Sequence, residues 1–227
     1  MASGTFKIMA IMGLLLLGSS VAYAVPTLII SDGNPLDTVT VVDNGAGDTN
    51  ASLGDVSWAG TVGEWTINVA AGITKPEQGS ATIPSMDFDY LIKTSGAGTL
   101  TATWSDTGFG PLTAPMIEFL ATWGVTNPSA DSAIYTTYQS SGSTVPATGL
   151  LTNSGTLTGA ASGSVIVPAN FVGSPFVLTQ ELTLTATGKS NFASGDLTLD
   201  AVPEPSALLL LGSGLLGFGF LRLRKRG

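Results

Sequence analysis

The sequence predicts an all-β protein: an antiparallel β-sandwich ectodomain with an N-terminal signal peptide and a C-terminal single transmembrane helix. Three observations favour the sandwich. Short segments of alternating apolar and polar residues follow one another, turn residues separate them, and the body shows no long 3.6-residue helical period. The clearest alternation is FVLTQELTLTATG at 176–188. There Leu178, Leu182 and Leu184 take one face of a strand with Gln180 among them, and threonines such as Thr179 take the other, solvated face.

The first element, residues 1–24, has the parts of a secretory signal peptide. Lys7 precedes an apolar run at 8–17, and small residues follow as far as Ala22 and Ala24. A charged start, a short apolar core and an A-x-A site are typical of such signals. The run of ten residues is too short to span a bilayer comfortably. We expect cleavage after Ala24 and a body outside the cytoplasm, with an uncleaved anchor or a buried helix as the alternative.

The body, residues 25–201, is about the size of one domain. Turn signals such as Asp32-Gly33-Asn34-Pro35 and Asn44-Gly45 divide it into short strands. The ten predicted strands are 27–30, 39–42, 64–70, 88–93, 99–105, 116–123, 133–138, 164–167, 176–187 and 196–201. The segment 116–122 is the one most open to a helical interpretation.

Composition excludes several function classes. All 16 acidic residues lie between Asp32 and Glu204, where only three lysines oppose them, so this stretch has a formal charge of −13. Such a body would be repelled by phosphates, and we expect no nucleic-acid partner. Cys and His are absent, which excludes disulfides, Ser-His-Asp triads, Cys-His pairs and the usual zinc sites. We expect a non-catalytic protein without cofactor or metal.

The last segment, residues 202–227, differs from the body. Pro203-Glu204-Pro205 precedes an uncharged run at 206–221, which at about 1.5 Å per residue would span roughly 24 Å as a helix. The two prolines lack N–H groups and are expected to keep the triplet out of a helix or a central strand. Four positive charges then form a cytoplasmic basic anchor by the positive-inside rule: Arg222, Arg224, Lys225 and Arg226.

This tail resembles the PEP-CTERM sorting signal of Gram-negative bacteria, since triplet, apolar run and basic end stand in the family's order. The resemblance implies that an exosortase, a membrane-embedded processing enzyme, recognises Pro203, Glu204 and Pro205 as substrate and removes the anchor. It also implies a single-pass inner-membrane intermediate with a periplasmic body, and then a cell-surface or extracellular product linked to exopolysaccharide or biofilm. A plain linker before an ordinary anchor is the alternative.

Two groups of acidic residues in the body could carry chemistry. Oxygen ligands cluster in DNGAGDTNASLGD and suit calcium, but Asp, Asn and Gly are also ordinary turn residues, and a solvated loop is the favoured interpretation. These residues are Asp43, Asn44, Asp48, Asn50 and Asp55. Asp87 and Asp89 share one face of a strand and could, with Glu64 or Glu118, form a glycosidase pair. Exposed carboxylates without a catalytic role are the simpler expectation.

The aromatic residues could stack on sugar rings, although aromatics in a sandwich more often lie in the core. They are Trp58, Trp65, Trp104, Trp123, Tyr135 and Tyr138. Three functions therefore remain. An exported envelope or matrix protein comes first, a carbohydrate-binding module acting on exopolysaccharide second, and a glycan-active enzyme third. A row of exposed aromatics would favour the second, and facing carboxylates in a pocket the third.

Overall fold

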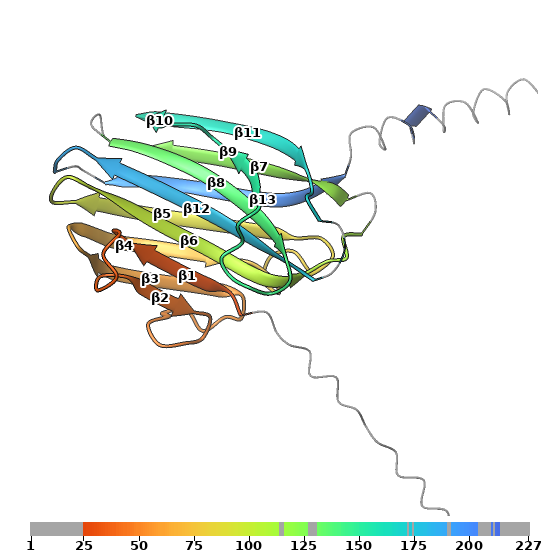
Figure 1. Cartoon of the computed structure of the whole chain (residues 1–227), viewed down its shortest axis with the longest axis horizontal. Helices are drawn as coiled ribbons and strands as arrows, with labels where there is room; N and C mark the ends of the chain where they lie inside the picture. The colour runs from red at the N-terminus through yellow and green to blue at the C-terminus, as the bar shows by residue number, and fades with distance from the viewer. Residues whose placement is uncertain are drawn as a thin grey trace, which may run out of the picture.

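The computed structural model describes residues 25–113, 116–126, 131–171, 173, 175–189, 192–203, 210, 212 and 213. Two antiparallel β-sheets pack face to face (Figure 1), so the predicted sandwich is confirmed. The predicted signal peptide and most of the predicted transmembrane run lie outside these residues. Within the described part of the chain, no helix combines the length and the apolar character that crossing a bilayer requires.

The first sheet has seven strands in the order β10-β8-β12-β6-β1-β2, with β9 also paired to β8. Its strands are β1 (Thr27–Ser31), β2 (Val39–Val42), β6 (Gly98–Phe109), β8 (Asp131–Ser141), β9 (Leu150–Asn153), β10 (Leu157–Thr158) and β12 (Phe176–Ala186). The second sheet has six strands in the order β11-β7-β13-β5-β4-β3. Its strands are β3 (Asp55–Val62), β4 (Trp65–Ile73), β5 (Ser85–Thr94), β7 (Met116–Thr126), β11 (Ala160–Pro168) and β13 (Ala193–Pro203). All ten predicted strands are present, and β3, β9 and β10 are additional.

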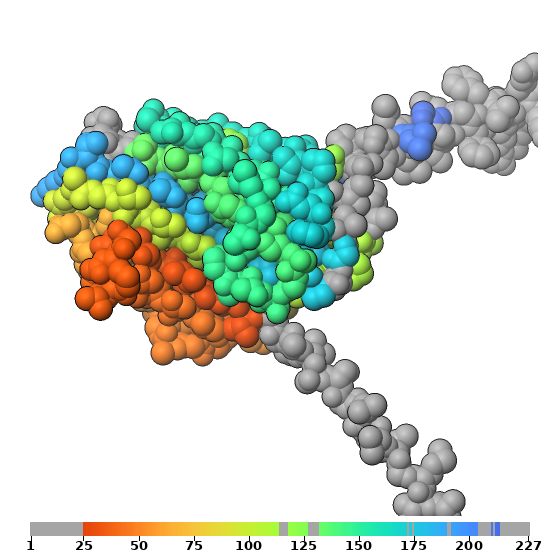
Figure 2. All heavy atoms as spheres, in the orientation of Figure 1, coloured from red at the N-terminus to blue at the C-terminus, as the bar shows by residue number. Residues whose placement is uncertain are grey.

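The alternation in β12 sets one face into the core, as predicted. Leu178, Gln180 and Leu182 are all at most 1% exposed. Thr179 points to the opposite face but is also buried, which differs from the solvated face expected for it. The reason is the connection 142–149, seen in green over the first sheet in Figure 2, whose Ala147 N–H donates to Thr179 Oγ1 at 2.8 Å. A strand's period therefore gives the direction of a side chain but not what covers it.

Large aromatic side chains fill the space between the sheets. Trp104 and Tyr135 are completely buried, and Trp65 is nearly so. Gly72 of β4 lies directly under Trp104, and a Cβ at this position would collide with the indole ring. The close approach of strand and indole therefore requires glycine here.

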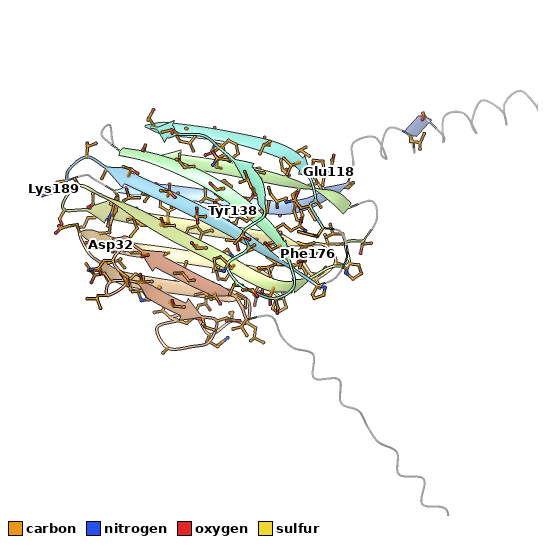
Figure 3. All side chains as sticks on the ribbon, in the orientation of Figure 1. Asp32, Glu118, Tyr138, Phe176 and Lys189 are labelled. Carbon is orange, nitrogen blue, oxygen red and sulfur yellow. The ribbon has the colours of Figure 1, made fainter. Side chains whose placement is uncertain are left out.

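The chain enters and leaves the sandwich at the same end, which we call the exit end. β6 ends and β7 begins on either side of the connection 110–115, and β13, antiparallel to β7, ends there at Pro203. β1 is antiparallel to β6, with Thr27 opposite Ser105, so the body also begins toward this end. In Figure 3, Glu118 and Phe176 lie toward the exit end, whereas Asp32 and Lys189 lie at the opposite, far end.

The last strand runs into the predicted sorting triplet. β13 continues two residues past the predicted end of the body, with Val202 opposite Glu118 and Pro203 opposite Met116 after a register shift. This differs from the expectation that proline keeps the triplet out of a central strand. The physical reason is that β5 begins at Ser85, opposite Asp200. Ala201 N still donates to the Pro84 carbonyl oxygen, but beyond Ala201 the strand β13 is paired only with β7, so Pro203 occupies an edge-like position where proline is tolerated.

Candidate functional site

Three carboxylates meet on the outer face of the second sheet. Asp87 and Asp89 stand two residues apart on β5 and share a face, as predicted, and Asp196 of β13 lies directly opposite Asp89. One oxygen atom of each lies within 4.8 Å of the others. In the part of the chain that the structure describes, no other group of three acidic side chains comes this close. We call these three residues the carboxylate cluster.

The cluster has unusual electrostatics. Burial, followed by the negative charges of Asp196 and Asp89, raises the pKa of Asp87 to about 7. Burial, and then the charge of Asp196, also raises the pKa of Asp89. Asp87 Oδ1 is buried and accepts no hydrogen bond from the described residues. Carboxylates placed in this way can share a proton or supply oxygen ligands to a divalent cation.

A hollow of about 350 Å³ opens beside the cluster, on β7 and β11. Its lining is Gly124, Val125, Thr126, Ala160, Ala161 and Ser162. Gly124 lies opposite Asp196 in the sheet, so hollow and cluster are neighbours. None of the lining residues is a carboxylate, and the cluster therefore lies outside the hollow instead of facing into it.

Glu64 and Glu118, the other two carboxylates considered for a glycosidase pair, lie apart from the cluster and from each other. Glu64 lies in the β3–β4 turn at the far end, where its carboxylate accepts a hydrogen bond from the Ser95 hydroxyl. Glu118 lies on β7 near the exit end, opposite Pro168 and Val202. Sequence reasoning missed Asp196 as the third member of the cluster. Its signal was the alternation in DLTLDAV, which puts Asp196 on the polar face, but the register to β5 is not visible in the sequence.

The Asp-rich loop that suggested calcium uses its carboxylates to hold the backbone. Asp48 Oδ2 accepts from Asn44 N at 2.8 Å and its Oδ1 from Ser57 N at 3.0 Å. Asp43 Oδ2 accepts from Gly54 N at 2.9 Å. Because these oxygens already accept backbone N–H groups, the geometry favours the structural interpretation of the loop.

The candidate sugar-stacking aromatics do not form an exposed row. Trp65, Trp104 and Tyr135 are buried, and the remaining three are half-buried. Tyr138 is held through a hydrogen bond from its Oη to Glu181 Oε1 at 3.2 Å. Among the described residues, no tryptophan or tyrosine is exposed.

Of the predicted processing residues, the structure describes Pro203 alone. Pro203 is the last residue of β13. The others lie outside the described residues: Ala22, Ala24, Glu204, Pro205, Arg222, Arg224, Lys225 and Arg226.

The family model for the PEP-CTERM protein-sorting motif matches residues 201–225. The match begins inside β13 and includes the triplet, the apolar run and most of the basic end. No curated protein matches the chain in sequence.

Three solved structures are similar to the sandwich in outline. A carbohydrate-binding module from the β-sandwich superfamily is 13% identical with a TM-score of 0.34, covering 78% of this chain and 71% of its own. TmCBM61 in complex with β-1,4-galactotriose is 4% identical with a TM-score of 0.31, covering 62% and 88%. Tailspike protein 4 of bacteriophage CBA120 is 8% identical with a TM-score of 0.31, covering 63% and 20%. At these scores the similarity carries no argument about function.

Proposed function

Since this chain ends in the PEP-CTERM sorting signal of an exosortase substrate, we propose that it is an exported, non-catalytic protein of the cell envelope or extracellular matrix. The observation that carries the proposal is the family match at 201–225, which begins in the last strand of the folded body. A sorting signal joined directly to a folded domain makes that domain the cargo of the sorting step.

The proposed route has two processing steps. The signal peptide directs the chain across the inner membrane and is removed after Ala24. The run 206–221 then holds the chain in the membrane with the basic end in the cytoplasm. The exosortase recognises Pro203, Glu204 and Pro205 and removes the tail, and the body reaches the surface or the exterior.

The product of this route is the sandwich, acting with exopolysaccharide or biofilm. Carbohydrate binding by a row of stacked aromatics is not supported, because the described tryptophans face or border the core and Tyr138, on the outer face of the first sheet, is half-buried. Glycan cleavage is not supported either, because the carboxylate cluster lies beside the hollow and not within it. We therefore place the structural role ahead of both alternatives.

The test is fractionation of the native host, with mass spectrometry of the mature protein's termini. We expect an N-terminus at Val25 and a C-terminus at or near the triplet. A variant with Pro203, Glu204 and Pro205 changed to alanine should remain full-length in the membrane. Ser206→Ala, just outside the triplet, is the matched control and should be processed normally. Normal processing of the triple variant would overturn the role assigned to the triplet.

A further inference from the structure

We propose that the exit end of the sandwich rests on the lipid surface for as long as the tail is uncut, with Ile83, Leu150 and Phe171 against the lipid. This inference rests on the proposed function, because it takes the run 206–221 as membrane-spanning. It adds the orientation of the body and the surface through which the body meets the membrane.

The connection between β13 and the apolar run is short. Pro203 is fixed in β13, and Glu204 and Pro205 are all that separates it from the apolar run. Fully extended chain spans at most about 3.5 Å per residue, so β13 ends within roughly 10 Å of the run. The headgroup layer on each side of a bilayer is about 5–8 Å thick. The exit end therefore lies in contact with that layer.

The body has a second connection at the same end. Thr27, the first residue of β1, follows the end of the predicted apolar run at 8–17 by ten residues, at most about 35 Å of extended chain. Before the signal peptide is removed, both apolar segments therefore attach to the exit end. Two attachments at one end, of which the one after Pro203 is short, disfavour turning of the far end toward the membrane.

The exit end carries exposed apolar side chains near β13. Ile83, Leu150 and Phe171 have 43%, 58% and 40% of their surface exposed. Ile83 precedes Pro84, whose carbonyl oxygen accepts from Ala201 N at 2.8 Å, so it lies beside the end of β13.

Leu150 and Phe171 lie close to each other on the neighbouring part of the exit end. Asn170, which precedes Phe171, donates from Nδ2 to the carbonyl oxygen of Leu150 at 3.1 Å. Phe171 follows the end of β11, where Pro168 is level with Val202 through Glu118 of β7. Apolar and aromatic side chains that reach the headgroup layer partition favourably into the membrane interface.

Because the body is acidic, its contact with the lipid surface depends on the tail that holds it there. The stretch from Asp32 to Glu204 carries a formal charge of −13 and is repelled by anionic lipid. The Asp-rich loop 43–55 also lies at the exit end, but on the side of β2 and β3, away from β13. The side bearing β13 and β11 therefore faces the lipid, and removal of the tail ends the contact.

The test uses the absence of cysteine from the chain, which makes single-cysteine labelling specific. An environment-sensitive fluorophore is placed at Ile83→Cys and, separately, at Phe171→Cys. Leu36→Cys, which is 92% exposed in the β1–β2 turn at the far end, is the matched control. Gly217→Cys reports on the tail. The tail-bearing chain is reconstituted in nanodiscs of phosphatidylethanolamine and phosphatidylglycerol, with a nitroxide quencher on the headgroup or the acyl chain.

We expect the headgroup nitroxide to quench the labels at Ile83→Cys and Phe171→Cys several-fold more than the label at Leu36→Cys, and the acyl-chain nitroxide to quench the tail label. Thermal melting checks that each labelled variant is folded. If the tail label is quenched but the exit-end labels match Leu36→Cys, this inference is overturned and the proposed function stands. If the tail label is not quenched, the membrane-anchored intermediate is itself overturned.

Discussion

Gln180 of β12 donates a hydrogen bond from Nε2 to Tyr135 Oη at 2.8 Å, in the buried space between the two sheets. The same amide group reaches the carbonyl oxygen of Leu197 on the second sheet at 3.0 Å, and Tyr135 Oη donates to the carbonyl oxygen of Thr198 at 3.1 Å. Buried polar groups that satisfy one another fix the relative position of the elements that carry them. This network therefore sets how the two sheets lie on each other.

The network predicts that loss of the single Tyr135 hydroxyl lowers the stability of the fold substantially. Tyr135→Phe removes the hydroxyl and leaves Gln180 and the Thr198 carbonyl with one partner fewer, so we expect a loss of about 1–3 kcal/mol in the free energy of unfolding. Urea unfolding at equilibrium measures it. Tyr138→Phe, on the same strand but half-buried, is the control and should lose less than about 0.5 kcal/mol. Equal losses for the two variants would contradict the bridging role of Tyr135.

The carboxylate cluster predicts a pH-dependent stability. Folded Asp87 has a pKa of about 7, against 3.8 for an aspartate in unfolded chain, so the folded state keeps a proton that the unfolded chain releases. As pH rises from about 4 through 7, ionisation of Asp87 therefore destabilises the fold. Asp87→Asn should increase the free energy of unfolding at pH 8, by roughly 1 kcal/mol after allowance for solvent screening, and should have little effect at pH 4.

Thermal melting of the native protein and of Asp87→Asn at pH 4 and pH 8 measures this difference in stability. Glu77→Gln, an exposed carboxylate outside the cluster, is the control. A stabilisation by Asp87→Asn that is the same at both pH values would show that ionisation of Asp87 is not its source.

The Asp-rich loop predicts that the stability of the fold depends on Asp48 and does not change when calcium is added. Asp48 accepts from three backbone N–H groups, those of Asn44, Asn50 and Ser57. Asp48→Ala should therefore lower the free energy of unfolding by about 1–2 kcal/mol. Added calcium should leave the melting temperature of the native protein unchanged, because RT ln(1 + [L]/Kd) is zero without binding. A rise with calcium that disappears in Asp48→Ala would restore the calcium interpretation.

The buried ion pair of Lys75 and Asp106 predicts that removing one partner destabilises the fold more than removing both. Lys75 Nζ lies 2.5 Å from Asp106 Oδ2, with the carboxylate completely buried, and 3.9 Å from the centre of the Phe109 ring. Burial raises the pKa of Asp106 and lowers that of Lys75, so each ion depends on the other. Lys75→Met leaves a buried carboxylate without its cation and should destabilise the fold by about 3–5 kcal/mol.

The double variant Lys75→Met with Asp106→Leu should recover most of that loss, because no buried charge remains. Lys93→Met is the control for the loss of a lysine, since exposed Lys93 lies 5.2 Å from the centre of the Phe192 ring and should contribute less than about 1 kcal/mol. Chemical denaturation of the native protein, Lys75→Met, Asp106→Leu and the double variant completes the cycle. A double variant no more stable than Lys75→Met would contradict the pairing.

Strand positions could be predicted where alternation is long and turns are clear. β12 alternates over eleven residues and was found almost to the residue. β9 and β10 have four and two residues, too few for a period, and β3 is an edge strand interrupted by a bulge between Trp58 and Gly60. These were missed because their pairing, and not their local sequence, makes them strands.

The candidate site was only partly accessible from the sequence. The common face of Asp87 and Asp89 follows from the two-residue period of a strand. Asp196 joins them only because β13 pairs with β5 in one particular register, across more than a hundred residues of chain. Register between distant strands is decided by the packing of the whole sheet. The buried carboxylate of Asp106 was invisible for the same reason.

The order of strands in the sheets differs from their order in the chain, and this constrains when the protein can fold. β12 joins β6 to β8, and β13 joins β5 to β7, yet these two central strands come last in the sequence. Both sheets remain split until residues 176–203 are available, and contacts of such sequence separation form late. A chain that crosses a membrane N-terminus first therefore completes neither sheet until the segment just before the tail has emerged. In the proposed route, the tail would keep the unfinished body at the membrane through the interval in which it becomes able to fold.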